Sequence, residues 1–510
     1  FGSKFGFPTH TMRWSLDVCF LNGASVAVSI DPDASVEDLR LEAQRKIKKQ
    51  VKGLVSGGSK LEKSSSLQAA GLKDGAQVSA VLGSEDVRVT AHKFGWGFGA
   101  IINGRLKIWG HEMFYQMTNE QKKMTEQDVL ELFFTETAVA AMKVNGEIVT
   151  CGDANAGGDS HLVQDQLVDV ASIVGNSRAF AALKLDGTLV CWGDPNSGGD
   201  CTNVQAHLRG IRQVFPSQNA FAAVTDTGRV VTWGQAEQGG DCSEVKDQLF
   251  GVKHVVASVH AFAALRRDGS VVSWGSADAG ADSSSVKDKL VKVKNVYASR
   301  YSFAAVLEDG TVVTWGPAEH GGDSSSVQSQ LVGVHHIEAS NSAFAAITVQ
   351  ASVDASKAES ESGPAIKVNL KSRVVTWGDQ DHGGCSNAVQ NQLEDIVQLK
   401  TTKHAFAALR SDGEVVAWGK DLYGGDASSV QKDLVNIQEI YSSQSSFAAL
   451  RADGHVVTWG HMDDMPDDDL VEALQSDIQY VACSKLSMTA VKNDGTFITW
   501  GSPDHGGSGP

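Results

Sequence analysis

The sequence of 510 residues has few prolines, few cysteines and no long apolar run, and each shortage narrows the class of protein. No apolar stretch approaches the roughly 18 residues that a membrane-spanning helix needs. The seven cysteines include no C-x-x-C pair, which argues against a disulfide framework and against a structural zinc site. Only 9 prolines beside 52 glycines, with 42% hydrophobic residues, indicate an ordered, turn-rich chain.

Basic residues are also in deficit, with 44 Lys and Arg against 61 Asp and Glu and a net charge of −17. A field of this sign repels phosphate backbones, so nucleic acid is a poor candidate partner and we expect protein partners. Unpaired thiols favour a reducing compartment, such as the cytoplasm, the nucleus or an organelle interior like the plastid stroma. Docking onto a membrane-bound complex stays open.

Motifs that carry catalysis are missing as well. The sequence has no Ser-His-Asp arrangement in a recognisable context, no phosphate loop, no H-E-x-x-H and no paired-carboxylate motif. His320, His382 and His505 stand at equivalent points of a repeat and lie too far apart in sequence to suggest one cluster. We therefore expect no enzymatic activity, no cofactor and no metal ion.

What the sequence does contain is a Trp-Gly step that returns every 41 residues. Cys151 stands where one tryptophan is due, and the single longer interval is explained by an insertion at residues 349–370, so ten repeats fill residues 87–510. A fixed period of this size is typical of repeat architectures. The tryptophans are Trp109, Trp192, Trp233, Trp274, Trp315, Trp377, Trp418, Trp459 and Trp500.

One repeat divides into three predicted strands, Val252 to Ala257, Ala261 to Leu265 and Ser270 to Trp274. Asp268-Gly269 separates the second from the third, and this dipeptide favours a tight hairpin because its turn requires positive φ. Both faces of the later strands are apolar, which indicates sheets covered on both sides by neighbouring sheets. We therefore expect blades stacked radially, mainly β.

The tryptophans are interpreted as packing wedges between blades and not as platforms for a ligand, because aromatic side chains dominate core energetics. Where Cys151 replaces the tryptophan, Phe133 and Phe134 stand in place of smaller residues. We interpret this exchange as compensation of volume.

Acidic residues follow most of the Trp-Gly steps, in Gly-Gly-Asp or Gly-Ala-Asp. Calcium loops need several oxygen ligands at tight alternate spacing, so helix caps are the preferred interpretation over a calcium site. In the segment from Asp323 to Leu331, Val327 and Leu331 then share one face of a short helix. The acids are Asp159, Asp200, Asp241, Asp282, Asp323 and Asp426.

The ninth repeat replaces this element with an acidic cluster, and the sixth carries the insertion. The cluster reads either as a solvated loop or as a docking patch for a basic partner. The insertion, residues 349–370, is rich in Ala, Ser and Glu, and we expect a disordered loop that leaves the ring. The candidate interaction patch consists of Asp463, Asp464, Asp467, Asp468 and Asp469.

Residues 12–83 follow a different pattern after an N-terminal extension at 1–11. Alternating segments on either side of Asn22-Gly23 predict a hairpin, and Ser35 caps a predicted helix that continues to about Gln50. With the later strands this gives a ββαββ order. Its signature S-L-x-x-A-G-L-x-D-G-x-x-V resembles the ubiquitin-like (β-grasp) fold. No Gly-Gly tail ends the segment at residue 83, so we expect no conjugation through it.

The run A-F-A-A-L-x-x-D-G-x-V-V-x-W-G resembles the repeat of the regulator-of-chromosome-condensation family, whose members form β-propellers. The repeats here are shorter than that family's, and they number ten instead of seven. The resemblance implies a propeller, and we expect a closed ring over a split ring or an open arc. Chains joining both modules are similar to algal proteins often labelled HERC-type ubiquitin ligases. The HECT domain such a ligase needs is not found in residues 1–510.

The function that we expect from this combination is that of a non-catalytic protein-protein interaction scaffold. Three alternatives stay open. The chain is a peripheral structural subunit of a large complex, photosynthetic or respiratory for example; it is an adaptor in a ubiquitin-ligase system; or it is a guanine-nucleotide exchange factor for a small GTPase, an activity that the family resemblance permits.

Overall fold

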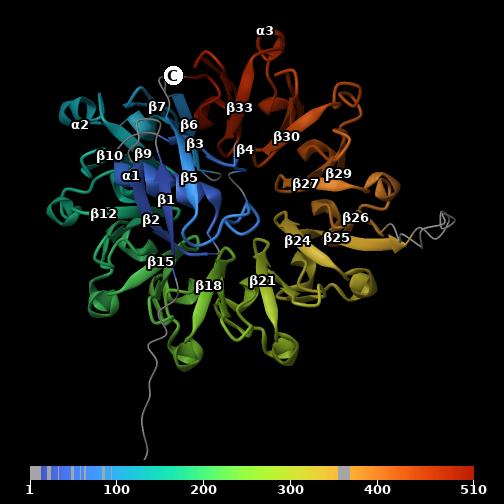
Figure 1. Ribbon diagram of the computed structural model, residues 1–510, viewed down its shortest axis with the longest axis horizontal. Helices are drawn as coiled ribbons and strands as arrows, with labels where there is room; N and C mark the ends of the chain where they lie inside the picture. Colours follow the sequence, from blue (N-terminus) through green and yellow to red (C-terminus); the bar gives the residue numbers. More distant parts are fainter. Residues whose placement is uncertain are drawn as a thin grey trace, which may run out of the picture.

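The computed structural model describes residues 13–19, 25–32, 34–47, 51–57, 59–62, 65–82, 87–92, 95–115, 117–353 and 368–509. Its main body is a ring of small sheets, and the N-terminal domain appears beside the first blades in the view of Figure 1. An ion pair between Asp31 and Arg212, 3.7 Å apart, joins this domain to the ring.

The N-terminal domain is a β-grasp fold, as its sequence predicts. Its mixed sheet has the strand order β2-β1-β5-β3-β4, in which β1 and β5 run parallel, and the helix α1 packs beside β2 and β3. Ser35 caps the helix, with its Oγ accepting the amide N–H of Asp38 at 3.1 Å. The elements are β1 (Trp14–Cys19), β2 (Ser25–Ile30), α1 (Val36–Ile47), β3 (Val51–Ser56), β4 (Ser59–Lys60) and β5 (Gln77–Leu82).

The part of residues 87–509 that the structure describes forms ten three-stranded antiparallel sheets, the blades. The first strands are β6 (Val87–Thr90), β9 (Val129–Phe134), β12 (Val170–Gly175), β15 (Ile211–Pro216), β18 (Val252–Ala257), β21 (Val293–Ala298), β24 (Val334–Ala339), β27 (Ile396–Thr401), β30 (Ile437–Ser442) and β33 (Ile478–Cys483). The second strands are β7 (Gly97–Ile102), β10 (Ala138–Lys143), β13 (Ala179–Lys184), β16 (Ala220–Thr225), β19 (Ala261–Arg266), β22 (Phe303–Leu307), β25 (Ala343–Val353), β28 (Ala405–Arg410), β31 (Ser446–Arg451) and β34 (Ser487–Lys492).

The third strand of each blade pairs with the second and forms one edge of the sheet. These strands are β8 (Arg105–Gly110), β11 (Ile148–Gly152), β14 (Leu189–Gly193), β17 (Val230–Gly234), β20 (Val271–Gly275), β23 (Val312–Trp315), β26 (Val368–Gly378), β29 (Val415–Gly419), β32 (Val456–Gly460) and β35 (Phe497–Gly501). Where an Asp-Gly or Asn-Gly step forms the turn between second and third strands, its glycine has positive φ, as Gly269 has at 77°. The dipeptide pattern predicts this conformation.

Short helices follow the third strand of every blade. In one of them the Gln328 amide donates to the Val312 carbonyl at 2.9 Å, which occupies a position on the open strand edge. The α-helices here are α2 (Asn119–Met124) and α3 (Asp468–Ala473). The 3-10 helices are Glu112–Tyr115, Ala154–Ala156, Gln164–Gln166, Pro195–Ser197, Thr202–His207, Ala236–Gln238, Ser243–Gln248, Ala277–Ala279, Ser284–Lys289, Ala318–His320, Ser325–Gln330, Gln380–His382, Gln390–Gln392, Asp421–Tyr423, Met462–Asp464 and Pro503–His505.

The ring is closed. The last blade lies against the first, β33 beside β6 (Figure 1), and the Val89 amide donates to the Tyr480 hydroxyl at 2.9 Å. Val89 and Val491 share one hydrophobic core cluster across this junction. The open arc and the split ring, which the repeat count alone permits, are therefore excluded.

The tryptophans of the third strands lie in the core between blades. Trp274 stacks on Phe262 with ring centroids 5.2 Å apart, and its indole N–H donates to the Gly239 carbonyl of the preceding repeat at 3.0 Å. Each such bond links two consecutive blades. The same bond is made by Trp192, Trp233, Trp315, Trp377, Trp418 and Trp459.

The second blade has lost both members of the stacked pair. Val139 pairs with Cys151, where eight of the other blades pair phenylalanine with tryptophan and the tenth pairs Met488 with Trp500. Phe134 packs against Cys151 as the volume argument predicts, but Phe133 belongs to the core cluster on the other side of the sheet. The rest of the space is filled by Phe114, a ring from a 3-10 helix whose place in this core the sequence does not indicate.

The insertion begins and ends as strand. We expected a loop over residues 349–370, whereas β25 continues to Val353 and β26 starts at Val368, paired residue for residue with it. The insertion replaces the tight turn between β25 and β26. The two strands therefore continue to pair beyond the point where the other blades turn. This hairpin projects outward from the ring (Figure 1). The expected disorder concerns residues 354–367, which lie outside the described residues.

Candidate binding site at the centre of the ring

The turn between first and second strands points to the centre of the ring, and its first residue is a small polar one in the second to tenth blades. In the fifth blade the Ser258 hydroxyl donates to the Ala279 carbonyl at 2.8 Å and accepts the Ala261 amide at 3.1 Å. These bonds fix the turn to its own strand and to the loop after Trp-Gly. The equivalent residues are Thr135, Asn176, Ser217, Ser299, Ser340, Thr402, Ser443 and Ser484.

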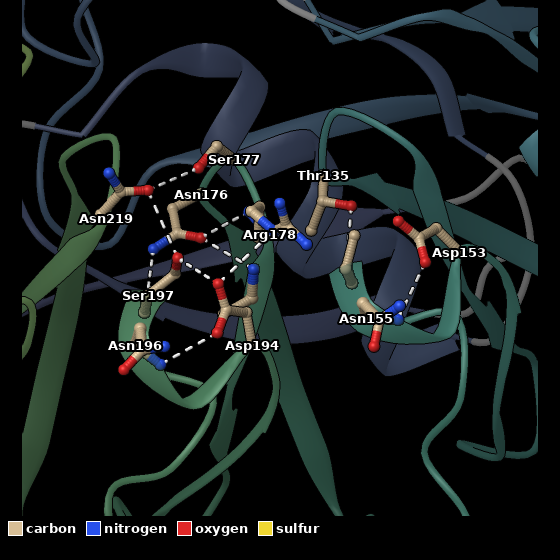
Figure 2. A network of polar contacts seen from close by, with 12 residues as sticks. Thr135, Asp153, Asn155, Asn176, Ser177, Arg178, Asp194, Asn196, Ser197 and Asn219 are labelled. Atoms are coloured by element: carbon tan, nitrogen blue, oxygen red, sulfur yellow. Dashed lines mark hydrogen bonds and ion pairs between the residues drawn. The ribbon is translucent and has the colours of Figure 1, made fainter.

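Figure 2 shows this network in two neighbouring blades. The Asn176 amide donates to the Ser197 carbonyl at 2.6 Å, and the Thr135 hydroxyl makes the equivalent bond in the preceding blade. The Ser177 hydroxyl reaches across to the next blade and donates to the Gln218 carbonyl at 2.6 Å. The turns are therefore linked to one another as well as to their own blades.

A cycle of backbone hydrogen bonds joins the turns. The amide of each second turn residue donates to the carbonyl of its counterpart in the next blade, from Glu136 to Ser177 at 3.1 Å and so on round to Lys485 and Gly95 at 3.1 Å, and Trp96 donates to Glu136 at 2.9 Å. We call these second residues the inner ring. Its members are Gly95, Glu136, Ser177, Gln218, Val259, Arg300, Asn341, Lys403, Gln444 and Lys485.

Most of the inner ring lines a central cavity of about 640 Å³. Three cations, Arg300, Lys403 and Lys485, face one carboxylate, Glu136, among these lining residues. Burial lowers the pKa of Lys403, and the charges of Lys485 and Arg300 lower it further. Burial raises the pKa of Glu136 against the opposing effect of those cations. The cavity is thus positive in a chain whose net charge is −17.

The inner ring was not predicted from the sequence, although a signal for it exists. The turn residue before it is always Ser, Thr or Asn in the second to tenth repeats, and two residues after it a small residue usually follows. The inner-ring position itself varies from apolar Val259 to acidic Glu136 and basic Arg300. The turn residue before the inner-ring position and the small residue two positions after it are nearly constant, whereas the inner-ring residue varies. Packing therefore does not determine this residue, and variable loop residues on a rigid scaffold often determine binding specificity.

The acids that follow Trp-Gly close short turns by accepting the backbone N–H two residues later. The expected helix cap is wrong in the sixth repeat, because the N-cap residue of the following 3-10 helix is Ser324. The Asp323 carboxylate accepts the Ser325 amide at 2.8 Å, and Val327 and Leu331 pack toward one core cluster. The bonds from Ser325 lower the pKa of Asp323. Asp159, Asp200, Asp241, Asp282 and Asp426 accept the same backbone bond. Within the described ranges, no group of three or more His, Cys, Asp or Glu could hold a metal ion.

The candidate acidic patch is smaller than its sequence suggests. Asp464 is buried and accepts a hydrogen bond from the Ser445 hydroxyl, and burial raises its pKa, so it does not belong to a surface patch. Asp467 caps α3, accepting the Leu470 amide at 2.9 Å. Asp463, Asp467, Asp468 and Asp469 are all exposed, so four of the five residues of the predicted patch lie at the surface. Charge pattern alone does not predict this burial, because it depends on the bond from the Ser445 hydroxyl in the turn of the same blade.

The histidines do not gather. His382 packs on His404 of the next repeat with centroids 4.2 Å apart, and His404 packs on Tyr423 at the same distance. Burial and the neighbouring His382 lower the pKa of His404 to about 4, so this ring is neutral at pH 7. His320 lies instead against Tyr301, and His505 against Trp96. These contacts are aromatic packing on separate blades.

The architecture is therefore a closed β-propeller of ten three-stranded blades with an N-terminal β-grasp domain. No family model and no curated protein matches the chain. Among solved structures, it is similar to the ectodomain of the receptor kinase CR4 from Physcomitrella patens, at 12% identity and a TM-score of 0.31 over 64% of this chain and 70% of that one. It is also similar to the UBL domain of Dsk2 from Plasmodium falciparum, at 23% identity and a TM-score of 0.14 over 14% of this chain and 100% of that domain.

Among the residues described, no helix has the length and apolar character to cross a membrane.

Proposed function

We propose that the chain is a non-catalytic scaffold that binds other proteins through the surface of its ring. The observation that carries the proposal is a row of exposed apolar side chains at one repeat position in consecutive blades. Phe250, Val291 and Val332 are 48%, 52% and 50% exposed, and 41 residues separate each from the next. We call these three residues the apolar row. Exposed apolar side chains that gather on one surface are typical of sites of protein contact.

The framework around the row supports this function. Blade-to-blade indole bonds and the closed cycle of turn bonds hold neighbouring blades in a fixed relation. The Arg266 guanidinium lies over the Phe250 ring at 3.9 Å, which fixes that side chain before any partner arrives. A pre-organised surface loses little conformational entropy on binding, so it gains affinity.

The resemblance of the repeats to the regulator-of-chromosome-condensation family, and the β-grasp domain, fit a protein that contacts other proteins. The partner itself can be identified by experiment. Affinity purification of the tagged full chain from its own cells, with mass spectrometry, separates the possibilities. One stoichiometric complex indicates a structural subunit, ligase components indicate an adaptor, and a lone small GTPase indicates nucleotide exchange.

Substitutions in the apolar row test whether these residues contact the recovered partner. Phe250→Asp combined with Val291→Asp and Val332→Asp should remove the recovered partner while leaving the melting temperature close to that of the parent. Leu162→Asp is the matched control, because Leu162 is 83% exposed and lies outside the row. Retention of every partner by the triple variant would overturn the assignment. Acceleration of nucleotide release from a GTPase by the purified chain would overturn the non-catalytic proposal.

A further inference from the structure

We propose that the central cavity binds a small molecule carrying several phosphate groups. The inference goes beyond the scaffold function and rests on different residues. It starts from the order of side chains round the inner ring. From the sixth to the tenth blade the members are Arg300, Asn341, Lys403, Gln444 and Lys485, so every side chain on this half of the ring can donate hydrogen bonds.

The three cations occupy alternate blades, with an amide between each pair. All of them line one cavity, so a ligand at its centre faces them together. A single phosphate cannot reach cations spread over half a ring, whereas a molecule with phosphates on several sides can. Arginine binds phosphate through a planar fork and lysine as a point charge, and both are common phosphate ligands.

The charges gathered here raise the free energy of the empty site. Lys403 is half-buried, and the pKa of its ammonium group falls in addition because Lys485 and Arg300 are near. Glu136 is the single carboxylate among the lining residues. A bound polyanion would relieve the repulsion among the cations, and this relief favours binding.

The backbone directs recognition to these side chains. The inner-ring amides of the second to tenth blades donate to the carbonyls of neighbouring blades and are not free for a ligand. The cavity of about 640 Å³ lies in the range of small-molecule sites, roughly 300–1,000 Å³. Long polyanions such as nucleic acid are disfavoured, because the field of the whole chain is negative.

The contact with the β-grasp domain lies away from the inner ring. Strand β15 runs from Ile211, next to the Arg212 that pairs with Asp31 of the β-grasp domain, to the turn at Ser217. The turns therefore lie at the opposite ends of the first strands from that contact. The ion pair that joins the β-grasp domain to the ring therefore does not involve the residues that line the cavity.

The test is calorimetric titration of the full chain with myo-inositol hexakisphosphate, with inorganic phosphate and citrate as separate arms. We expect saturable binding of the hexakisphosphate and at least ~100-fold weaker binding of inorganic phosphate, since several phosphates meet several cations. Lys403→Gln combined with Lys485→Gln should weaken binding at least tenfold, and Glu136→Gln should strengthen it several-fold. Lys287→Gln combined with Lys289→Gln changes the charge equally at exposed positions, and it should leave affinity unchanged.

Several results would overturn the proposal. These are no binding of the hexakisphosphate, equal loss in the exposed control, or equal affinity for inorganic phosphate. Binding of citrate without the hexakisphosphate would overturn the choice of phosphate. If the double lysine variant does not fold, Arg300→Gln takes its place, because Arg300 is exposed. Its failure to weaken binding would then count against the site.

Discussion

The seven regular blades differ from the three blades at the junction of the chain's two ends in how the tryptophan position packs against the preceding repeat. In the regular blades, from Trp192 to Trp459, each indole donates to a glycine carbonyl of the preceding repeat. At the junction the indoles of Trp109 and Trp500 have no hydrogen-bond partner within the described residues, and Cys151 replaces the third.

The difference has local causes. Met465, with φ of −85°, stands where Trp500 would find its glycine, because the acidic run replaces the usual loop. Trp109 instead stacks on Phe497 of the last blade, with centroids 5.3 Å apart. The junction is thus held by aromatic packing and the Tyr480 bond, and the regular blades by one bond repeated. Trp500 lacks the bond because the preceding repeat supplies no glycine there, whereas Trp109 lacks it although Gly506 lies at the equivalent place.

The largest expected effect is at a regular blade. Trp315→Ala should lower the free energy of unfolding by about 3–5 kcal/mol, because it removes a buried indole that packs on Phe303 and bonds to Gly280. Urea denaturation of the full chain measures this loss. Trp315→Phe should cost about 1 kcal/mol more than Trp500→Phe, since only Trp315 of the two has an N–H partner among the described residues. Equal costs for the two phenylalanine variants would remove the contrast between regular and junction blades.

The glycine that accepts the indole bond gives the next effect. A Cβ on Gly239, whose φ is 97°, would lie 2.5 Å from the Phe262 ring. Gly239→Ala should therefore cost about 3 kcal/mol, from backbone strain and overpacking together. Gly146 has a φ of 85° with nothing within 4 Å of such a Cβ, so Gly146→Ala isolates the strain at about 1–2 kcal/mol. Thermal unfolding of both variants checks the order.

A tryptophan introduced at position 151 tests whether the second blade has room for the indole that the regular blades contain. Cys151 is fully buried among Phe114, Phe134 and Val139, so the space of an indole is already filled. Cys151→Trp should destabilise the protein by about 1–3 kcal/mol through overpacking. The melting temperature of the variant measures it. An unchanged or raised melting temperature would show that the second blade keeps room for the ring and that no compensation occurred.

The smallest effect concerns the aspartates that follow Trp-Gly. Asp323→Ala should cost about 0.5–1 kcal/mol, since it removes the acceptor of the Ser325 amide. The folded-state pKa of Asp323 is lowered, so its contribution is present above 3.8, the ordinary value, and is lost as pH falls through the lower folded value. The difference between parent and variant should therefore shrink in acid. A difference that stays constant from neutral pH into strong acid would assign the loss to something other than the carboxylate.

Most of the fold could be predicted from the sequence, because its determinants are local. The Asp-Gly turns, the Ser35 cap and the alternating strands each act within a few residues. The inner ring could not be predicted, because Glu136 and Lys485 share a cavity only after ten blades have closed. Closure itself depends on Tyr480 meeting Val89, a contact that no repeat period encodes.

The candidate site also combines features that local sequence predicts with features that depend on the folded ring. The acidic run predicts a surface patch from charge alone, but burial of Asp464 depends on a hydroxyl from the turn before β31, that of Ser445. The cationic side of the cavity consists of residues spread from Arg300 to Lys485. Their nearness follows from ring geometry and not from spacing in the sequence.

Closure of ten blades into one ring, with the indoles in its constant core and a cationic cavity inside its turns, is the property on which the other conclusions depend. An electron cryomicroscopy map of the full chain at side-chain resolution tests it most directly. We expect density for β6 beside β33, with Tyr480 against Val89 and the indoles buried between blades. A gap between the first and last blades, or indole rings lining an open cleft, would contradict closure and the packing role of the tryptophans.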